Sequence, residues 1–208
     1  MFTSSYRDTC LAAMGGFVSL IVGITDWRAG TITEASYTGY GTRPAWTKNT
    51  AAATSPVGGR QVTNNGAVTF PQNTGSAQDV IAFGIHTAST AGTLQAIGLL
   101  DADPPIFGTA EETAEDITAP AHGLATDQRV FVLAAPGAVI PTGLSENTAY
   151  FVLAAGLTAN AFRLSTTSGG SAVNITAKGA AMFIPYTAVT IATNATPSFA
   201  DTVLKVQM

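Results

Sequence analysis

The feature that most constrains this 208-residue chain is a succession of short strand-like segments separated by turn residues. It is clearest in the second half, where we expect strands at 115–122, 129–135, 148–154, 160–166 and 172–177. Strands of this length and spacing, parted by Gly, Pro, Asn and Ser, are typical of a small all-β module. Phe162 and Leu164 alternate with Arg163 and Ser165, which indicates a sheet with one solvated face.

The first hundred residues indicate a short helix and then more strands. Ser5 and Asp8 have the S-x-x-D spacing of a helix start, and Gly15-Gly16 supplies a stop. Tyr6, Cys10 and Met14 fall on one face of this helix, where Cys10 is expected to be a small buried residue. Further strands are expected at 17–25, 60–71, 79–86, 93–101 and 204–208.

The strand pattern changes at Asp103-Pro-Pro105, which indicates a domain boundary. We predict an all-β protein in which a β-sandwich host domain, with its short N-terminal helix, spans residues 1–105 and 186–208. A small inserted β domain would occupy residues 106–185. Insertions of this kind succeed at loop tips whose two ends lie close together. Residues 26–60 hold few large apolar side chains and are expected to be mostly loop.

Charged residues make up 11% of the chain, against about 25% for an ordinary soluble domain. A free monomer with so few charges is expected to be only modestly soluble. We therefore expect copies of the chain or a partner to cover much of its surface. A Thr-rich sandwich that exists alone is the alternative.

Several partners are disfavoured by the sequence. Nine Lys and Arg, scattered singly in a chain of net charge −4, do not form the basic stripe that nucleic-acid binding needs. The longest apolar run starts at Phe17 and is broken by Ser19 and Gly23, which is too short to cross a membrane. The N-terminus lacks a signal-peptide pattern. A single cysteine, Cys10, excludes an internal disulfide framework.

Few residues are suited to catalysis, and we expect no catalytic, metal or cofactor site. His86, His122 and Cys10 lie in separate parts of the pattern, and His122-Gly123 is expected to form a turn. Asp101 and Asp103 beside Pro104-Pro105 are a weak pair for glycoside hydrolysis, and turn chemistry explains them better. The acids at 111, 112, 115 and 116 match no calcium-loop spacing and indicate a solvated edge. The protein is therefore expected not to be an enzyme.

Aromatic residues remain as candidates for binding. Large aromatic side chains dominate the energetics of protein interfaces. We predict that they anchor this chain to a neighbouring subunit; stacking on sugars is the alternative. The predicted interface residues are Phe2, Trp27, Tyr37, Tyr40 and Trp46.

Four segments carry a resemblance to a known family. They are Tyr37-Thr-Gly-Tyr40, Asn65-Gly-Ala-Val-Thr-Phe-Pro71, Ile81-Ala-Phe-Gly-Ile85 and Ala88-Ser-Thr-Ala-Gly-Thr-Leu94. In these segments the chain resembles small tailed-bacteriophage virion structural proteins, of the tail-fibre-like and capsid decoration kind. The separate pattern Ile117-Thr-x-x-x-His122-Gly-Leu124 resembles a β-module of phage tail and virion proteins.

The resemblance implies a bacteriophage virion structural protein, assembled in the cytoplasm of the host bacterium. The main hypothesis is a capsid decoration, or cement, protein. It would stabilise the outer shell as a homo-oligomer in contact with the major capsid protein and other virion proteins. The chain shows no triple-stranded shaft repeat or coiled coil, which favours this hypothesis. The alternative is a tail fibre or baseplate component that contacts a glycan of the host-cell surface.

Overall fold

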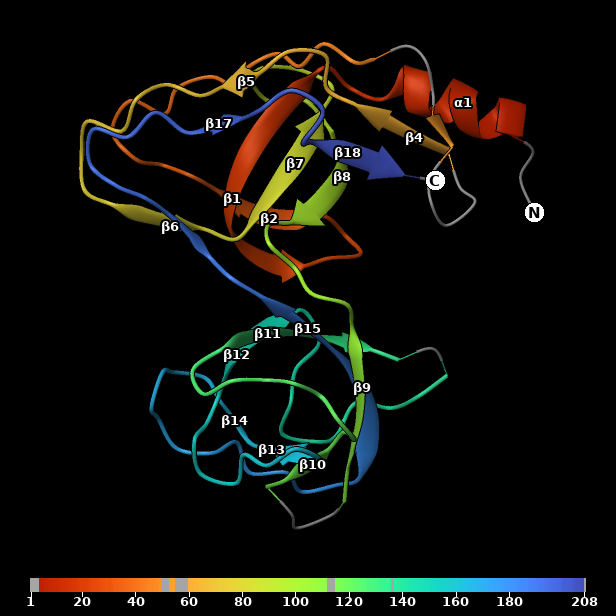
Figure 1. The fold of residues 1–208 in the computed structure, drawn as a ribbon, viewed down its shortest axis with the longest axis vertical. Coiled ribbons are helices and arrows are strands. Elements are labelled where there is room, and N and C mark those ends of the chain that lie inside the picture. The colour runs from red at the N-terminus through yellow and green to blue at the C-terminus, as the bar shows by residue number, and fades with distance from the viewer. Residues whose placement is uncertain (1–3, 50–52, 55–59, 112–114, 136, 208) are drawn as a thin grey trace. The chain divides into compact units, whose positions relative to one another are not determined.

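A computed structural model describes residues 4–207 except 50–52, 55–59, 112–114 and 136. In this part of the chain the regular elements are strands, apart from the N-terminal helix α1 (Ser4–Ala13) (Figure 1). The predicted all-β class with a short N-terminal helix is thereby confirmed. The chain forms two compact units. Unit 1 comprises Met1–Gly23, Ile32–Gly98 and Val189–Met208, and unit 2 comprises Ile24–Thr31 and Leu99–Ala188.

The division into units differs in detail from the predicted domain boundaries. The longer segment of unit 2 runs from Leu99 to Ala188, so it contains the whole predicted insertion, residues 106–185. It also includes Ile24–Thr31, a segment that the sequence analysis assigned to the host domain. That residues 106–185 fold as an independent inserted domain stays a prediction.

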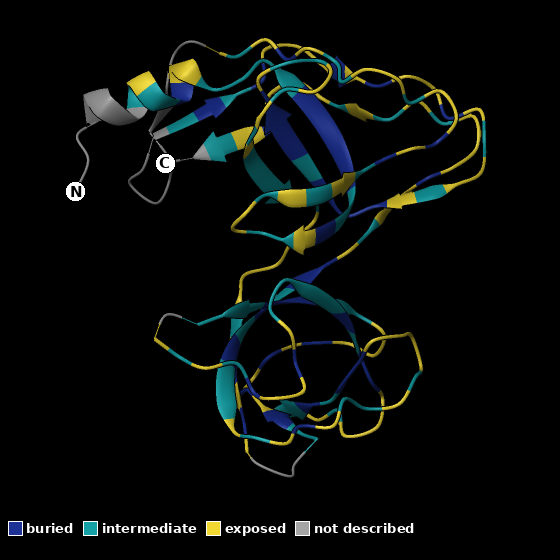
Figure 2. Ribbon diagram, turned by 180° about the vertical axis from the view of Figure 1, so that it is seen from behind, coloured by how far each residue is buried: buried dark blue, intermediate teal, exposed yellow. Residues whose placement is uncertain are grey.

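The main sheet of unit 1 has the strand order β2 (Thr31–Glu34), β1 (Phe17–Asp26), β7 (Ala82–His86), β8 (Leu94–Leu99). The two central strands are antiparallel, with Ser19 opposite Gly84 and Leu20 opposite Phe83. Runs of Val, Ile and Leu favour an extended, buried backbone here. Figure 2 shows in dark blue how buried residues gather on these central strands, among them Val18 and Ile85.

The C-terminal segment of unit 1 pairs repeatedly with the segment that precedes β7. The pairs join β16 (Val189–Ile191) to β6 (Gln78–Val80) and β17 (Ser198–Phe199) to β5 (Val68–Thr69). In a third small sheet, β4 (Arg60–Thr63) lies between β18 (Lys205–Gln207) and β3 (Ala53–Thr54). The single strand expected over 60–71 is therefore two short strands, β4 and β5.

Two fully buried asparagines hold this returning segment in place. The Asn64 amide donates to the carbonyls of Gly66 (2.8 Å) and Ala200 (2.7 Å) and accepts from the Leu204 amide (3.0 Å). The Asn73 amide donates to the carbonyl of Ile191 at 3.2 Å. Both side chains are 0% exposed, so these bonds replace water for groups that are costly to bury unpaired.

A row of aromatic rings runs through unit 1. Each ring lies within 6.3 Å of the next, measured between centroids, in edge-on or stacked geometry. Pairs of this kind add about 0.5–1.5 kcal/mol beyond the area that they bury. The row consists of Tyr37, Tyr40, Phe70, Phe199 and Phe83.

Helix α1 packs differently from the face that its sequence indicated. Leu11 is its buried residue at 1% exposure, whereas Cys10 is only half-buried. The Lys48 ammonium donates to the carbonyls of Ala12 (2.7 Å) and Met14 (2.5 Å), at the end of the helix where carbonyls have no partner within the helix. A cation at a helix C-terminus also interacts favourably with the helix dipole.

The sheet of unit 2 closes on itself. Its strand order is β13 (Ala161–Phe162), β10 (Ile117–Thr118), β9 (Ile106–Ala110), β15 (Gly179–Tyr186), β11 (Arg129–Ala134), β12 (Thr148–Val152), β14 (Leu164–Ser165). The two end strands, β13 and β14, are consecutive in the chain and are separated only by Arg163. One segment therefore pairs with β10 on one side and with β12 on the other, which gives a barrel-like sheet.

Two strands of this barrel were absent from the sequence prediction. β9 and β15 were not expected, although β15 is central and pairs with both β9 and β11. Its sequence, GAAMFIPY, begins with small residues and contains Pro185, so it lacks an alternating strand pattern. Conversely, residues 172–177 form no strand, although Ile175 is buried in the barrel core. Among the described residues, their only strand-like pairing is an isolated bridge between Ala177 and Thr142.

Candidate functional site

Several side chains that could take part in chemistry surround His86, at the end of β7. Ser19 on β1 places its hydroxyl oxygen 2.8 Å from Nε2 of His86. Glu34, at the end of β2, has a carboxylate oxygen 3.9 Å from the same nitrogen. A serine, a histidine and an acid thus meet, although the sequence analysis placed none of them in a site.

Gly84 makes room for the contact between Ser19 and His86. A Cβ atom at this position would lie 2.7 Å from the Ser19 hydroxyl oxygen and 3.0 Å from Nε2 of His86. It would also lie 2.8 Å from a methyl carbon of Leu94. Glycine is therefore needed here for close approach of side chains, as expected for a glycine inside a strand.

Glu34 is held by two further side chains. Arg43 donates from Nε to both carboxylate oxygens, at 3.1 and 3.2 Å, and also from Nη2. Another Arg43 nitrogen donates to the Ala88 carbonyl at 3.0 Å. The Tyr40 hydroxyl donates to Glu34 at 3.3 Å and accepts from the Leu20 amide at 3.2 Å. Burial, above all, raises the pKa of Tyr40, so this phenol stays protonated.

The geometry does not match a catalytic triad. In a triad the acid binds the ring nitrogen opposite to the one that faces the serine. Here Ser19 and Glu34 both approach Nε2 of His86. Ser19 is 0% and His86 2% exposed, and burial together with the Arg43 charge lowers the pKa of His86. A neutral, enclosed histidine bonded to a strand serine is a structural link between β1 and β7.

The predicted interface aromatics are placed mainly inside the protein. Trp46 is 3% and Tyr37 5% exposed, and the Trp46 indole nitrogen donates to the Gly15 carbonyl at 2.7 Å. Tyr40 is half-buried in the Glu34 cluster. Within unit 2, the ring of Trp27 lies 5.7 Å from that of Phe131. Phe2 lies outside the described residues.

This placement changes how these aromatics are interpreted. Residues 26–60 were expected to be mostly loop with few large apolar side chains, yet this segment contributes the rings of Tyr37 and Trp46 to the core of unit 1. Little of either ring is left for a partner to contact. That the five aromatics form a subunit interface stays a prediction.

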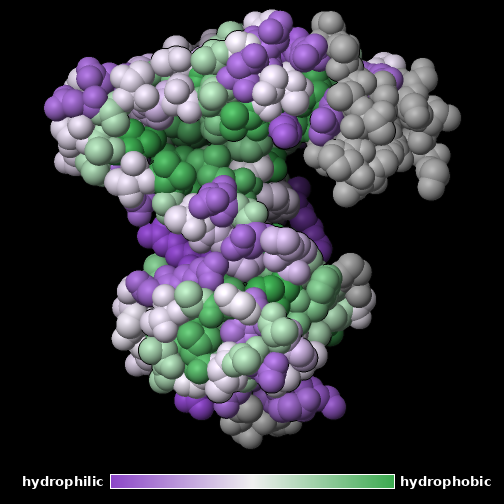
Figure 3. Space-filling model, viewed as in Figure 1, coloured by the Kyte–Doolittle hydropathy of each residue, from purple (hydrophilic) through white to green (hydrophobic). Residues whose placement is uncertain are grey.

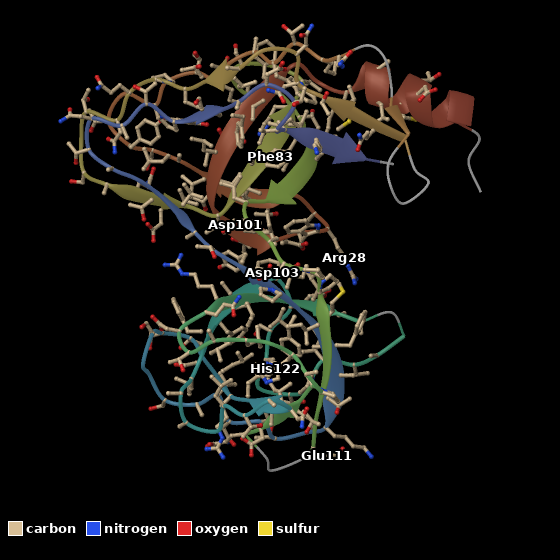
Figure 4. The ribbon with its side chains drawn as sticks, in the orientation of Figure 1. Arg28, Phe83, Asp101, Asp103, Glu111 and His122 are labelled. Atoms are coloured by element: carbon tan, nitrogen blue, oxygen red, sulfur yellow. The ribbon has the colours of Figure 1, made fainter. Side chains whose placement is uncertain are left out.

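The turn predicted at His122-Gly123 lies just before these residues, at Pro120 and Ala121, and His122 and Gly123 follow it. Gly123 has a φ of +69°, which L side chains rarely adopt. Nδ1 of His122 accepts from the Leu124 amide at 3.0 Å, and its ring lies 5.1 Å from that of Phe162. Figure 4 shows His122 within the body of unit 2. The prediction of a structural histidine here is confirmed.

The remaining acidic candidates also take part in structural contacts, Asp101 and Asp103 through their backbone. Asp101 accepts through its carbonyl from the Thr187 amide at 3.2 Å, and the Asp103 amide donates to the Pro185 carbonyl at 2.9 Å. Asp116 accepts from Arg163 at 2.6 Å and Glu115 does so at 3.1 Å, at the seam of the barrel. The acids near 115 are thus paired with a cation.

Within the described part of the chain, no group of three or more His, Cys, Asp or Glu is arranged to hold a metal ion. No helix among these residues is long and apolar enough to span a membrane.

Exposed apolar side chains are the feature that sequence reasoning missed. Figure 3 shows hydrophobic areas, in green, among the hydrophilic ones on the visible face of each unit. In unit 2, Phe107 on β9 is 61% and Val139 77% exposed, and in unit 1 Val189 is 47% and Val203 58% exposed. Phe107 is opposite Met182 on β15. Successive side chains of a strand point to opposite faces of the sheet. If β9 had been predicted, this alternation would have indicated that Phe107 is exposed.

A family model described as "Podophage GP4 fiber I protein gp80" matches residues 12–119, just over half of the chain. The match covers the four segments that carried the resemblance to virion proteins, and it ends inside the Ile117–Leu124 pattern. Comparison with curated proteins and with solved structures finds no match.

Proposed function

Since this chain belongs to the family of podophage GP4 fiber I protein gp80 and is a phage virion structural protein, we propose that it is a component of the tail fibre. The family match is the observation that carries this proposal. It covers most of the described part of unit 1 and extends through β9 and β10 of unit 2.

The family favours the fibre alternative over capsid decoration. The description of the matching family names a fibre protein and does not mention a capsid. Capsid decoration was favoured because the chain has no shaft repeat. This absence concerns one chain and does not tell where in the particle the chain is located. A fibre assembled from several proteins does not require the repeat to lie in each of them.

The role that we propose is structural and non-enzymatic. The Ser19, His86 and Glu34 cluster is enclosed and has the wrong geometry for nucleophilic catalysis. The expected partners are other copies of the chain and other tail proteins, with assembly in the host cytoplasm. Under this proposal a glycan of the host-cell surface is the ligand class that the fibre contacts.

The experiment is electron microscopy of particles that lack this gene, compared with wild-type particles and with a complemented deletion. The expected result is that density disappears from the tail fibres while the capsid shell is unchanged. Loss of density from the shell with intact fibres would support capsid decoration instead. Labelling an affinity tag on the protein with gold particles gives an independent location.

A further inference from the structure

The connection between β4 and β5 in unit 1 carries an Asn-Gly pair that is open to solvent. Asn65 and Gly66 follow β4, and both are exposed. They form the sole Asn-Gly pair of the sequence. Gly66 has a φ of +88°, and no atom beyond its chain neighbours lies within 4 Å of the place that a Cβ would take. Because glycine has no side chain, other groups can approach its backbone nitrogen closely.

Asn65 and the adjacent Asn64 are held very differently. The Asn64 side chain is 0% exposed and its amide is bound through both its nitrogen and its oxygen. Within the described part of the chain, the side chain of Asn65 has no hydrogen-bond partner, and only its backbone amide is bound. The side-chain carbonyl carbon of Asn65 is therefore free to rotate toward the backbone nitrogen of Gly66.

The backbone amide of Gly66 faces a carboxylate. Its N–H donates to Oδ1 of Asp201 at 2.8 Å, and Asp201 is exposed. A general base must lie within hydrogen-bond reach, about 2.6–3.2 Å, of the group whose proton it removes. Asp201 meets this requirement for the Gly66 amide. The Asn65 amide donates instead to the Thr47 carbonyl at 2.7 Å, an oxygen that is not basic enough to remove a proton.

We propose that Asn65 is a site of spontaneous deamidation and that Asp201 is the general base of this reaction. The Gly66 nitrogen attacks Cγ of Asn65 while Asp201 takes the amide proton. Asp201 then returns the proton to the side-chain nitrogen, the bond between Cγ and this nitrogen breaks, and ammonia leaves. The product is a five-membered succinimide ring. Water opens the ring at either carbonyl and leaves an aspartate or an isoaspartate. The chain thus modifies itself and turns over no substrate.

Either product disturbs contacts that hold the C-terminal segment of unit 1. Isoaspartate adds a carbon atom to the backbone between Asn64 and Gly66, whose carbonyl accepts from the Asn64 amide at 2.8 Å. The same Asn64 side chain binds the Ala200 carbonyl and the Leu204 amide. An aspartate brings a second carboxylate close to Asp201, and like charges repel. We therefore expect aged samples to unfold at a lower temperature than fresh ones.

The first test follows the purified full-length chain during incubation at neutral pH. Peptide mapping by mass spectrometry measures the conversion of each asparagine, and enzymatic methylation detects isoaspartate. We expect Asn65 to convert at least tenfold faster than Asn194. Asn194 is the internal control because it is also exposed, whereas the next residue is Ala195, whose amide donates to the Ala192 carbonyl at 3.1 Å. Equal conversion at the two positions would overturn the inference.

The second test separates the base from the hydrogen bond. Asp201→Asn keeps an oxygen that can accept from the Gly66 amide but removes the group that takes the proton. Conversion at Asn65 should slow at least fivefold in this variant, while conversion at Asn194 stays the same. An unchanged or faster conversion at Asn65 would show that Asp201 is not the base, and would contradict the proposal. Circular dichroism and thermal unfolding establish that the variant is folded like the wild type.

Discussion

At the scale of single residues, unit 1 depends on polar side chains that are completely enclosed. Asn64 makes two donor bonds and one acceptor bond to backbone groups, and Asn73 bonds to the segment near Ile191. The hydrogen bonds of each side-chain amide hold the C-terminal segment at places where that segment forms no regular strand pairing. These residues join parts of the chain that are more than one hundred positions apart.

Replacing Asn64 should destabilise unit 1 strongly. Asn64→Ala leaves two carbonyls and one amide without their partner, and each buried unpaired group costs about 1–3 kcal/mol. We expect a loss of about 3–5 kcal/mol in the free energy of unfolding. Chemical denaturation measures it. Asn65→Ala, at the adjacent exposed position, is the control and should change stability by less than about 0.5 kcal/mol. Equal effects of both variants would contradict this role.

His86 should make stability depend on pH. Burial and then the Arg43 charge lower its pKa in the folded protein below the ordinary value of about 6.5. The unfolded chain therefore takes up the proton first as the pH falls. The contribution of neutral His86 is complete above about pH 6.5 and is lost progressively below it, by up to about 1.4 kcal/mol per pH unit.

Denaturation at pH 7.5 and pH 5.5 tests this expectation. In His86→Gln the free energy of unfolding should fall less between the two pH values than in the wild type. His122→Gln, which removes the only other histidine of the chain, is the comparison variant. A His86→Gln variant with an unchanged pH dependence would show that other groups are responsible.

At the scale of elements, the ends of α1 and of the barrel strands are secured by long side chains. Lys48 binds the carbonyls at the C-terminal end of α1, and Trp46 binds the Gly15 carbonyl next to it. Arg163 performs a similar task in unit 2, where it binds Glu115 and Asp116 across the junction of β13 and β14. Lys48 binds backbone carbonyls at a helix end, whereas Arg163 binds side-chain carboxylates that precede β10.

The link to α1 can be removed with little change in shape. Lys48→Met keeps the aliphatic stem but removes the donors for the Ala12 and Met14 carbonyls. We expect a loss of about 1–2 kcal/mol and faster hydrogen exchange in α1 than in β1 and β7. Lys205→Met, at an exposed position of β18, is the control. Unchanged exchange in α1 would show that Lys48 does not stabilise the helix.

At the scale of the whole molecule, the chain enters and leaves unit 2 at neighbouring points. The Thr187 amide donates to the Asp101 carbonyl at 3.2 Å, and Ala102 is bridged to Tyr186. Two chain ends this close can be joined by a short turn without moving either of them. This proximity is the structural requirement for a domain inserted into a loop.

Excision of residues 102–186 tests the insertion. We expect the chain joined through an Asn-Gly turn between Asp101 and Thr187 to fold and to unfold cooperatively. Trp27→Ser is included because the Trp27 ring packs on Phe131, which the excision removes. Circular dichroism and thermal unfolding provide the readout, with the full chain carrying Trp27→Ser as control. If that control folded and the shortened chain did not, the insertion hypothesis would be wrong.

The parts of the fold that were predicted correctly have strong local signals. The start and stop of α1, the apolar strand β1 and the structural role of His122 each follow from residues within one short segment. The clusters around His86 and Asn64 could not be predicted in this way. Ser19, Glu34 and His86 are brought together from three strands, and nothing near any one of them in the sequence indicates its partners. Trp46 was recognised as an anchor, but the sequence does not distinguish an internal anchor from an external one.

The sequence by itself determined the all-β class, the N-terminal helix, most strand positions and the resemblance to phage virion proteins, because these depend on local patterns of apolar and turn residues. Only the tertiary structure decided that β15 is the central strand of a barrel-like sheet and that the predicted interface aromatics Tyr37 and Trp46 are internal. Each of these depends on which segments pair across long separations. Pairing is set by the combined burial and hydrogen bonding of the whole chain, to which a single segment contributes only a part.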